Sequence, residues 1–426
     1  MSAPQMSPPS QPPAARPRDW RPRRLPVDLL RLPRSAGLSH MRRAREAASG
    51  ANFPPAMSFT PSAILGWARH YLAYIIRNKH LFPPYTASPQ HAMYDLLDEH
   101  GSDTVRIALV GDWGTGTDEA VCVAREMTKF KPHFTLHIGD VYYVGDPVEV
   151  NENCLGIRNP VNNYAPAVWP IGSLGSFAMN GNHEMLANGI GYFDVLLPHL
   201  GLKVAGQMQG QQTSFFCLQN KYWRVIAIDT GYNSTGIPIL EEIPLIDKIS
   251  LVCGNCKLPD KLIEWLKTVV IPRADDPRGI ILLSHQQYYS AFEGPFTKPA
   301  RQLWQAGIKG PVLWFWGHEH RFAGYDLFGK DHLKAYGRCV GHGGMPLSLC
   351  LPTKKPQPKF YDVRKGTQGF GVNGHVNLHF QGPHLEATYV DLNGTELVKE
   401  KWSVDTSGAI HLDCYQKILQ DPDFHG

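Results

Sequence analysis

From about residue 104 onward, short apolar runs alternate with segments that have helical periodicity. The apolar runs lie at residues 105–110, 134–138, 177–179, 223–228, 280–283 and 312–316. Residues 117–130 and 259–270 repeat their apolar positions at the spacing of amphipathic helices. Continuous apolar runs separated by helices are typical of strands that are covered on both faces. The pattern therefore predicts an α/β protein.

The C-terminal part of the chain has a different pattern. Residues 375–403 alternate between apolar and polar side chains, and Asn393-Gly394 interrupts them. Asn-Gly between alternating segments is a strong signal for a β-hairpin. We expect one metal-dependent domain at residues 104–403, a helical N-terminal extension at 57–103 and a C-terminal tail at 404–426.

Positive charge is concentrated in the first 56 residues, which are rich in Pro, Ala, Arg and Ser. They contain ten Arg and three acidic residues, so that residues 57–426 hold 32 basic and 35 acidic ones. We expect residues 1–56 to be disordered. They resemble an organelle transit segment, a basic arm for nucleic acid or anionic membrane, or sequence upstream of a start at Met57. The near-neutral remainder makes nucleic acid an unexpected partner except through this arm.

The apolar segments are short in comparison with a membrane-spanning helix. No run reaches the roughly 20 apolar residues that a span needs, because Arg69 and His70 interrupt the longest candidate at residues 64–76. The N-terminus lacks the compact apolar segment of a secretory signal. We therefore predict no membrane span and a cytoplasmic protein.

Five apolar runs lead directly into short polar turns that contain Asp, Asn or His. These turns are Gly111-Asp112-Trp113-Gly114, Gly139-Asp140-Val141-Tyr142-Tyr143, Gly181-Asn182-His183-Glu184, Ser284-His285 and Gly317-His318-Glu319-His320. Ligands of α/β sheets collect at the carboxyl ends of the strands. Carboxylate, amide and imidazole groups suit divalent or trivalent transition metals. One such turn alone is usually structural, but five with the same chemistry predict a metal site.

In order and spacing, these motifs resemble the calcineurin-like metallophosphoesterases, and among them the purple acid phosphatases. The resemblance covers about residues 104–345, and the C-terminal strands are similar to the closing segment of that family. It implies a layered α/β/β/α sandwich with two metal ions at one edge, at the carboxyl ends of the strands.

The resemblance also implies a role for each matching residue. Asp140 bridges both metals, because its carboxylate has two oxygens to share. The other implied ligands are Asp112 and His320 for the first metal, and Asn182, His285 and His318 for the second. His183 is implied to be catalytic, since it lies over the phosphate and stabilises charge or protonates the leaving oxygen.

The first motif departs from the pattern of many calcineurin-like enzymes. They read Asp-x-His, and the histidine binds metal, whereas this chain has Gly114 at that position. Purple acid phosphatases share the loss and supply a tyrosine three residues after the bridging aspartate, which corresponds here to Tyr143. Tyr142 is expected on the opposite side of an extended segment. A phenolate suits Fe(III), so the resemblance implies iron paired with iron, zinc or manganese.

Hydrolysis of a small-molecule phosphate monoester by a hydroxide that two metals activate is the function we expect. A phosphodiesterase that acts on nucleotides or lipid headgroups is a second interpretation, because specificity is determined by loops such as residues 144–176 and 231–258. A non-catalytic scaffold that keeps the metals or only the fold is a third. All seven predicted ligands and His183 are present, which favours an enzyme.

Overall fold

The computed structural model describes Tyr74 and residues 77–158, 166–234, 256–271, 276–329, 333–366 and 370–426. The predicted disordered segment at residues 1–56 lies outside the described residues. Within them, none of the helices is long and apolar enough to cross a membrane.

Two large mixed sheets form the centre of the described chain. The first has the strand order β1 (Met93–Asp95), β7 (Phe216–Gln219), β8 (Trp223–Ala227), β9 (Gly279–Ser284), β10 (Val312–Trp316), β12 (Ala335–Val340), β11 (Phe322–Phe328), β13 (Phe360–Asp362) and β18 (Phe424–His425). The second has the order β17 (Ile410–Lys417), β16 (Glu396–Val404), β15 (His384–Asp391), β14 (Gly374–Gln381), β2 (Thr104–Val110), β3 (Phe134–His137), β4 (Gly175–Ala178), β5 (Gly201–Val204) and β6 (Gln207–Met208).

Strands near the middle of both sheets run parallel to their neighbours. In the first sheet β8, β9 and β10 are parallel, and in the second β2, β3 and β4 are parallel. The carboxyl ends of each set therefore lie at one edge of their sheet. These six strands match the six apolar runs of the sequence.

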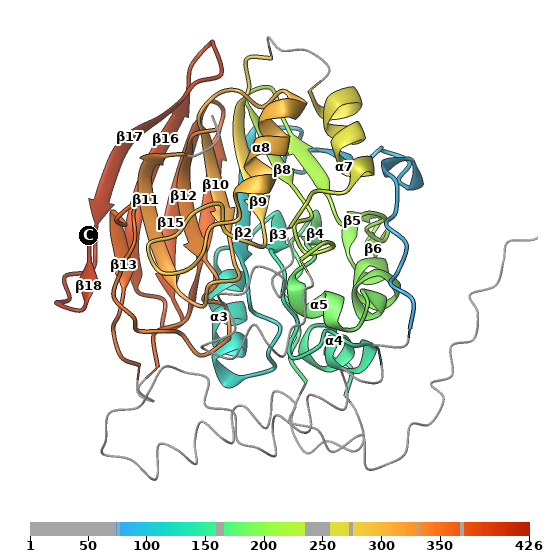
Figure 1. Cartoon of the computed structure of the whole chain (residues 1–426), viewed down its shortest axis with the longest axis horizontal. Helices are drawn as coiled ribbons and strands as arrows, with labels where there is room; N and C mark the ends of the chain where they lie inside the picture. Colours follow the sequence, from blue (N-terminus) through green and yellow to red (C-terminus); the bar gives the residue numbers. More distant parts are fainter. Residues whose placement is uncertain are drawn as a thin grey trace, which may run out of the picture.

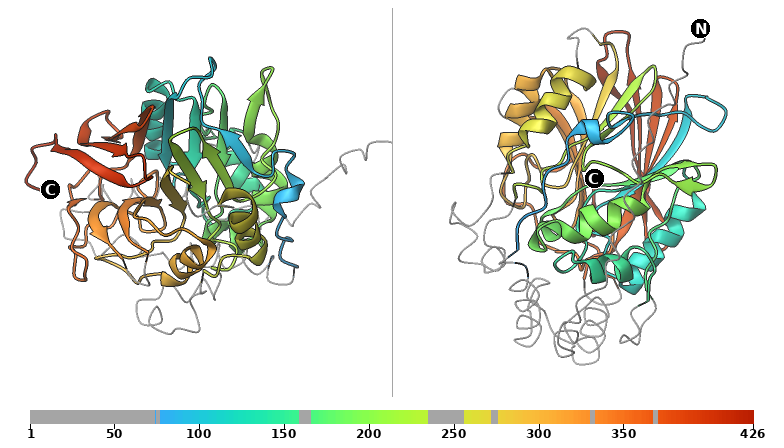
Figure 2. Two further views of the ribbon diagram at one scale, coloured as in Figure 1. Left: turned by 90° about the horizontal axis from the view of Figure 1, so that it is seen from above. Right: turned by 90° about the vertical axis from the view of Figure 1, so that its right-hand side faces the viewer.

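Helices cover the outer face of each sheet, as Figure 2 shows most clearly in its right-hand view. The helices are α3 (Asp118–Lys129), α4 (Pro147–Asn153), α5 (Asn182–Leu186), α7 (Asp260–Trp265) and α8 (Thr297–Ala306). Short 3-10 or π turns are η2 (Tyr85–Ala87), η3 (Tyr192–Leu196), η4 (Leu197–His199) and η5 (Leu266–Val270). In Figure 1, α7 and α8 lie near the top, and α3, α4 and α5 lie near the bottom.

Alternate residues of one strand enter different cores, which accounts for the continuous apolar runs. On β2, Ile107 and Leu109 point into the core between the sheets, whereas Ala108 and Val110 pack with α3. On β10, Leu313 belongs to the central core, and its neighbours pack with α7 and α8. A strand with helices on one face and a sheet on the other needs apolar residues at every position. The α/β/β/α sandwich is confirmed.

Local signals also match the structure where the chain changes direction. The Thr117 hydroxyl accepts a hydrogen bond from the Ala120 amide and so caps α3. Asn393-Gly394 lies in the turn between β15 and β16, and Gly394 has a φ of +84°. The glycine relieves the steric cost of this left-handed conformation.

Most of the first part of the predicted extension at residues 57–103 lies outside the described residues; before residue 77, Tyr74 alone is described, and it is helical. Residues 77–103 contain the turn η2 and the strand β1, which pairs with β7. Beyond residue 403, β17 pairs with β16, and β18 pairs with β13. The predicted tail therefore completes both sheets, because each short strand hydrogen-bonds to a strand of the core.

Candidate metal centre

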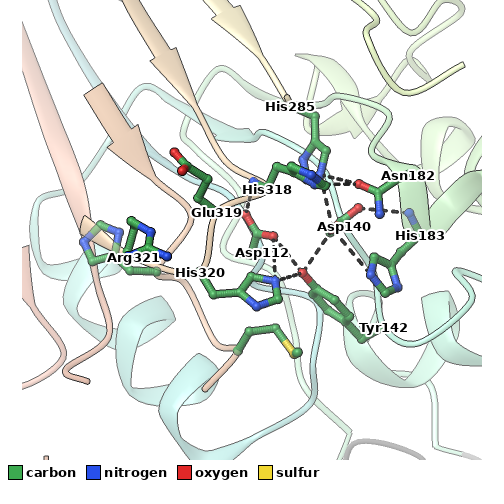
Figure 3. Close-up of polar contacts among 12 residues, drawn as sticks. Asp112, Asp140, Tyr142, Asn182, His183, His285, His318, Glu319, His320 and Arg321 are labelled. Carbon is green, nitrogen blue, oxygen red and sulfur yellow. Dashed lines mark hydrogen bonds and ion pairs between the residues drawn. The ribbon is translucent and has the colours of Figure 1, made fainter. Parts of the chain in front are cut away.

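The predicted ligands meet at one edge of the sandwich, because each follows a strand. Asp112 follows β2, Asp140 follows β3, and Asn182 is the first residue of α5 after β4. From the other sheet, His285 follows β9, and His318 and His320 follow β10. The site therefore draws on both sheets, and Figure 3 shows these side chains converging on Asp140.

Two groups of potential ligand atoms share Asp140. Asp112, Asp140 and His320 form one group, and Asp140, His285 and His318 form the other; within each group the ligand atoms lie within 4.8 Å of one another. Asp140 Oδ2 is 3.2 Å from His285 Nε2, and Asp112 Oδ1 is 3.4 Å from His320 Nε2. Two adjacent ligand sets with a common carboxylate fit two ions that one aspartate bridges.

Asn182 completes the second group through its side-chain oxygen. Asn182 Oδ1 lies 3.0 Å from His285 Nε2 and 2.9 Å from His318 Nδ1. On the far side of its ring, His285 Nδ1 lies 3.0 Å from the carbonyl oxygen of Ile138. A proton on Nδ1 satisfies that carbonyl, which leaves the Nε2 lone pair directed toward a metal. The donor set of this group thus fits a transition metal.

The tyrosine that reaches the first group is Tyr142. Its hydroxyl oxygen lies 2.7 Å from Asp112 Oδ1, 3.0 Å from Asp140 Oδ2 and 2.9 Å from His320 Nε2, and its one proton can be donated to either carboxylate. Tyr143 instead contributes its backbone carbonyl oxygen, which accepts a hydrogen bond from His183 Nδ1. The hydroxyl of Tyr142 therefore lies within the first group, which makes Tyr142 a candidate tyrosine ligand beside the predicted Tyr143.

The local backbone is not extended, although the expected placement of Tyr142 and Tyr143 on opposite sides requires an extended segment. Residues 142–144 form a turn instead of an extended strand, and Asp140 has a φ of +72°. Side chains alternate between faces only where the chain is extended. The position three residues after Asp140 consequently does not decide which ring enters the site.

Three of the candidate ligands have left-handed backbone conformations. Besides Asp140, Asp112 has a φ of +60° and His318 has a φ of +65°. Such conformations cost about 1–3 kcal/mol each in non-glycine residues and concentrate at functional sites. Gly181 permits the close approach of the third motif, since a Cβ there would overlap Asp140 Oδ1. Backbone conformation and sheet geometry together aim the ligands at one point.

Electrostatics hold the two carboxylates in their charged form. Burial raises the pKa of Asp140, but His285 and His183 outweigh it, and the net pKa lies well below the ordinary value. For Asp112, burial raises the pKa, but the hydrogen bond with His320 and the charges of His285 and His320 together outweigh it, so the net pKa is lowered. Burial, followed by the charges of Asp112 and Asp140, raises the pKa of Tyr142 well above its ordinary value. In the absence of metal, Tyr142 therefore stays a neutral phenol, whose single hydroxyl proton can be donated to either carboxylate.

His183 lies at the side of the cluster and is held by two contacts. Its backbone amide donates to Asp140 Oδ1 at 3.1 Å, and its ring Nδ1 donates to the Tyr143 carbonyl. Nε2 lies 3.9 Å from Asp140 Oδ2, and the ring packs against Tyr142 with centroids 4.3 Å apart. This arrangement directs Nε2 toward the cluster without placing it in either ligand group.

Glu184 is fully buried and supports the bridging residue. Its Oε2 accepts hydrogen bonds from the backbone amides of Asp140 at 3.2 Å and Gly181 at 2.9 Å. This carboxylate connects the turn after β3 to the turn after β4, because both backbones donate to the same oxygen.

Comparisons with known proteins agree with this architecture. The family model for calcineurin-like phosphoesterases matches residues 105–322, and no curated protein sequence matches the chain. Among solved structures, Plasmodium GAP50, described as the anchor in the inner membrane complex, is similar with a TM-score of 0.46 at 15% identity, covering 71% of this chain and 90% of that chain.

Two phosphatases are also similar in structure. A purple acid phosphatase from yellow lupin (Lupinus luteus) seeds has a TM-score of 0.48 at 15% identity, covering 75% of this chain and 58% of that chain. A dimetal phosphatase from Danio rerio has a TM-score of 0.40 at 8% identity, covering 71% and 99% of the two chains. Since the family model matches more than half of its length, the chain belongs to the calcineurin-like phosphoesterase family.

Proposed function

We propose that this protein hydrolyses phosphate monoesters with two metal ions bound at the shared carboxylate of Asp140. The observation that carries the proposal is the pair of ligand groups that have this residue in common. Two ions bound side by side polarise a phosphate and lower the pKa of a coordinated water. The proposed ligands are Asp112, Tyr142 and His320 for one ion, Asn182, His285 and His318 for the other, and Asp140 for both.

Iron is the proposed metal for the first position, with iron, zinc or manganese at the second. The support is Tyr142, because a phenol oxygen that becomes an anionic ligand favours a hard trivalent ion. The second group offers two imidazoles and an amide oxygen, which suit a divalent ion.

His183 is proposed to act on the leaving group. The Tyr143 carbonyl fixes the orientation of the ring through Nδ1, so that Nε2 is the nitrogen that can meet the substrate. A proton on Nε2 stabilises the charge that develops on the departing oxygen and is then transferred to it. Partial exposure of Asn182, His318 and His320 gives a small phosphoester access to the cluster.

A comparison of p-nitrophenyl phosphate with bis-p-nitrophenyl phosphate tests the reaction class. A monoesterase should turn over the first substrate at least about tenfold faster, which corresponds to about 1.4 kcal/mol of transition-state preference. The reverse ranking would support the phosphodiesterase interpretation. Binding of both metals without turnover of either ester would support the non-catalytic scaffold. The cytoplasmic location and the partners of the N-terminal arm stay predictions.

A further inference from the structure

A sixth polar turn follows an apolar strand and lies outside the five motifs that carry the candidate ligands. Asp229-Thr230-Gly231 comes directly after β8, which pairs in parallel with β9 along residues 223–227 and 279–283. The turn consequently lies beside the one that carries His285. All three residues are buried in the protein.

Asp229 holds the chain just before Asn182. Its carboxylate accepts from the Asn180 side-chain amide, with Nδ2 at 3.2 Å from Oδ2 and 3.4 Å from Oδ1. Oδ1 also accepts from the backbone amide of Tyr232 at 2.7 Å. Asn180 is fully buried, and the contacts of its Nδ2 with this carboxylate orient its side chain.

Thr230 holds the neighbouring ligand turn in the same way. Its hydroxyl oxygen accepts from the backbone amides of His285 at 3.2 Å and Gln286 at 3.1 Å. These two amides lie just beyond the end of β9 at Ser284. A methyl group in place of the hydroxyl would leave both buried amides without this acceptor.

Gly231 presses directly against the third motif. A Cβ on this residue would overlap the carbonyl oxygen of Asn180 and lie 2.6 Å from that of Gly181. Only glycine lets the backbone of this turn pass so close to the Asn180–Gly181 backbone. Three consecutive residues thus contact the two segments that present Asn182 and His285.

We propose that Asp229, Thr230 and Gly231 are positioning residues that set the distance between Asn182 and His285, and so tune the affinity of the second metal. The inference rests on the proposed function, because it takes Asn182 and His285 as ligands. None of the three residues touches the metal or the substrate in this account. They hold the segments that present the metal ligands. Loss of such an orienting contact typically weakens metal binding about 10- to 100-fold.

The direct test is calorimetric titration of metal-stripped protein with Zn²⁺, comparing Thr230→Val with Thr230→Ser. The His285→Ala variant first identifies which binding step belongs to the second group. Thr230→Val should weaken that step about 10- to 100-fold and leave the other unchanged, whereas Thr230→Ser should stay near the wild type because it keeps the hydroxyl.

An exchange of side chains tests the Asp229 contact independently. Asp229→Asn places two amides opposite each other, and Asn180→Asp places two carboxylates opposite each other. Each variant should therefore weaken the Zn²⁺-binding step of the second ligand group. The double variant restores one amide and one carboxylate, and should recover at least half of the lost binding free energy.

Asp391→Asn is the matched control, because Asp391 is a buried strand-end carboxylate that also accepts from loop amides but lies at the end of β15. It should lower the melting temperature without changing either metal step. Equal Zn²⁺ affinity in Thr230→Val and Thr230→Ser, or an equal loss in the control, would overturn the inference. A wild type that binds fewer than two ions would instead overturn the proposed function.

Discussion

The hydroxyl of Tyr142 lies 2.7 Å from Oδ1 of Asp112, 30 residues away along the chain. The same hydroxyl also lies 3.0 Å from Asp140 Oδ2, so it can supply a ligand atom to the first group, which Gly114 cannot. Because Fe(III) bound to a tyrosinate absorbs visible light by charge transfer, we expect iron-loaded protein to be violet to pink. Tyr142→Phe should bleach the colour, and Tyr143→Phe should preserve it.

Visible absorption spectra of the two variants, together with iron analysis, check this assignment. Retained iron in a colourless Tyr142→Phe protein would locate the charge-transfer ligand at Tyr142. Bleaching by Tyr143→Phe alone would return the assignment to Tyr143. A colourless wild type with bound iron would remove the tyrosine ligand altogether.

Asp140 is common to both ligand groups, so its replacement should affect both ions. We expect Asp140→Asn to lower turnover more than about 100-fold, since losing a shared ligand should exceed the effect of losing an outer contact. Metal analysis should give less than two ions per chain, whereas Glu293→Gln, at a half-buried residue outside both groups, should keep both. An active Asp140→Asn enzyme with two bound ions would rule out the bridge.

His183 should matter more for poor leaving groups than for good ones. We expect His183→Ala to keep both metals and to lower turnover of alkyl phosphates by about 10²- to 10⁴-fold. The loss should be smaller for p-nitrophenyl phosphate, because its leaving group needs little protonation. Steady-state kinetics across esters of increasing leaving-group pKa check the trend. A constant loss would indicate charge stabilisation, and lost metal would make His183 a ligand.

Buried His375 makes the stability of the folded protein depend on pH. Burial, followed by the nearby His342, lowers the pKa of His375 to about 3, while Asn377 opposes the shift. At pH values between the ordinary histidine pKa and the lowered pKa of His375, the unfolded chain binds a proton that the folded chain does not. The free energy of unfolding therefore falls as pH falls. His375→Gln should reduce this slope by about 1.4 kcal/mol per pH unit between about pH 5.5 and 4.5.

Urea unfolding of the wild type and His375→Gln at the two pH values measures that slope. His342, with a pKa lowered to about 4 by burial, continues to contribute in both proteins. Identical slopes would mean that His375 is protonated in the folded state over this range.

The sandwich and most of the site were predictable, because both depend on strand ends. Apolar runs located the central parallel strands, and polar turns after five of them located Asp112, Asp140, Asn182, His285, His318 and His320. The approach of the Tyr142 hydroxyl to Asp112 and Asp140 was not predictable, since it depends on a turn that the sequence pattern treats as extended. Strands β17 and β18 were missed because each is short or largely exposed, with a weak apolar pattern.

Asp229 was missed for a different reason. It follows an apolar run in the same way as the other motifs, and that signal could have found it. Its side chain faces Asn180 instead of the ligand groups, and this orientation follows from tertiary packing that no spacing reveals.

Titration of metal-stripped protein, with turnover of p-nitrophenyl phosphate followed against the number of ions bound, tests the central claim most directly. If the two ligand groups that share Asp140 each bind an ion, activity should appear only as the second equivalent of metal binds. It should reach its maximum at two ions per chain. Full activity at one ion per chain, or activity in the stripped protein, would contradict a dinuclear phosphoesterase.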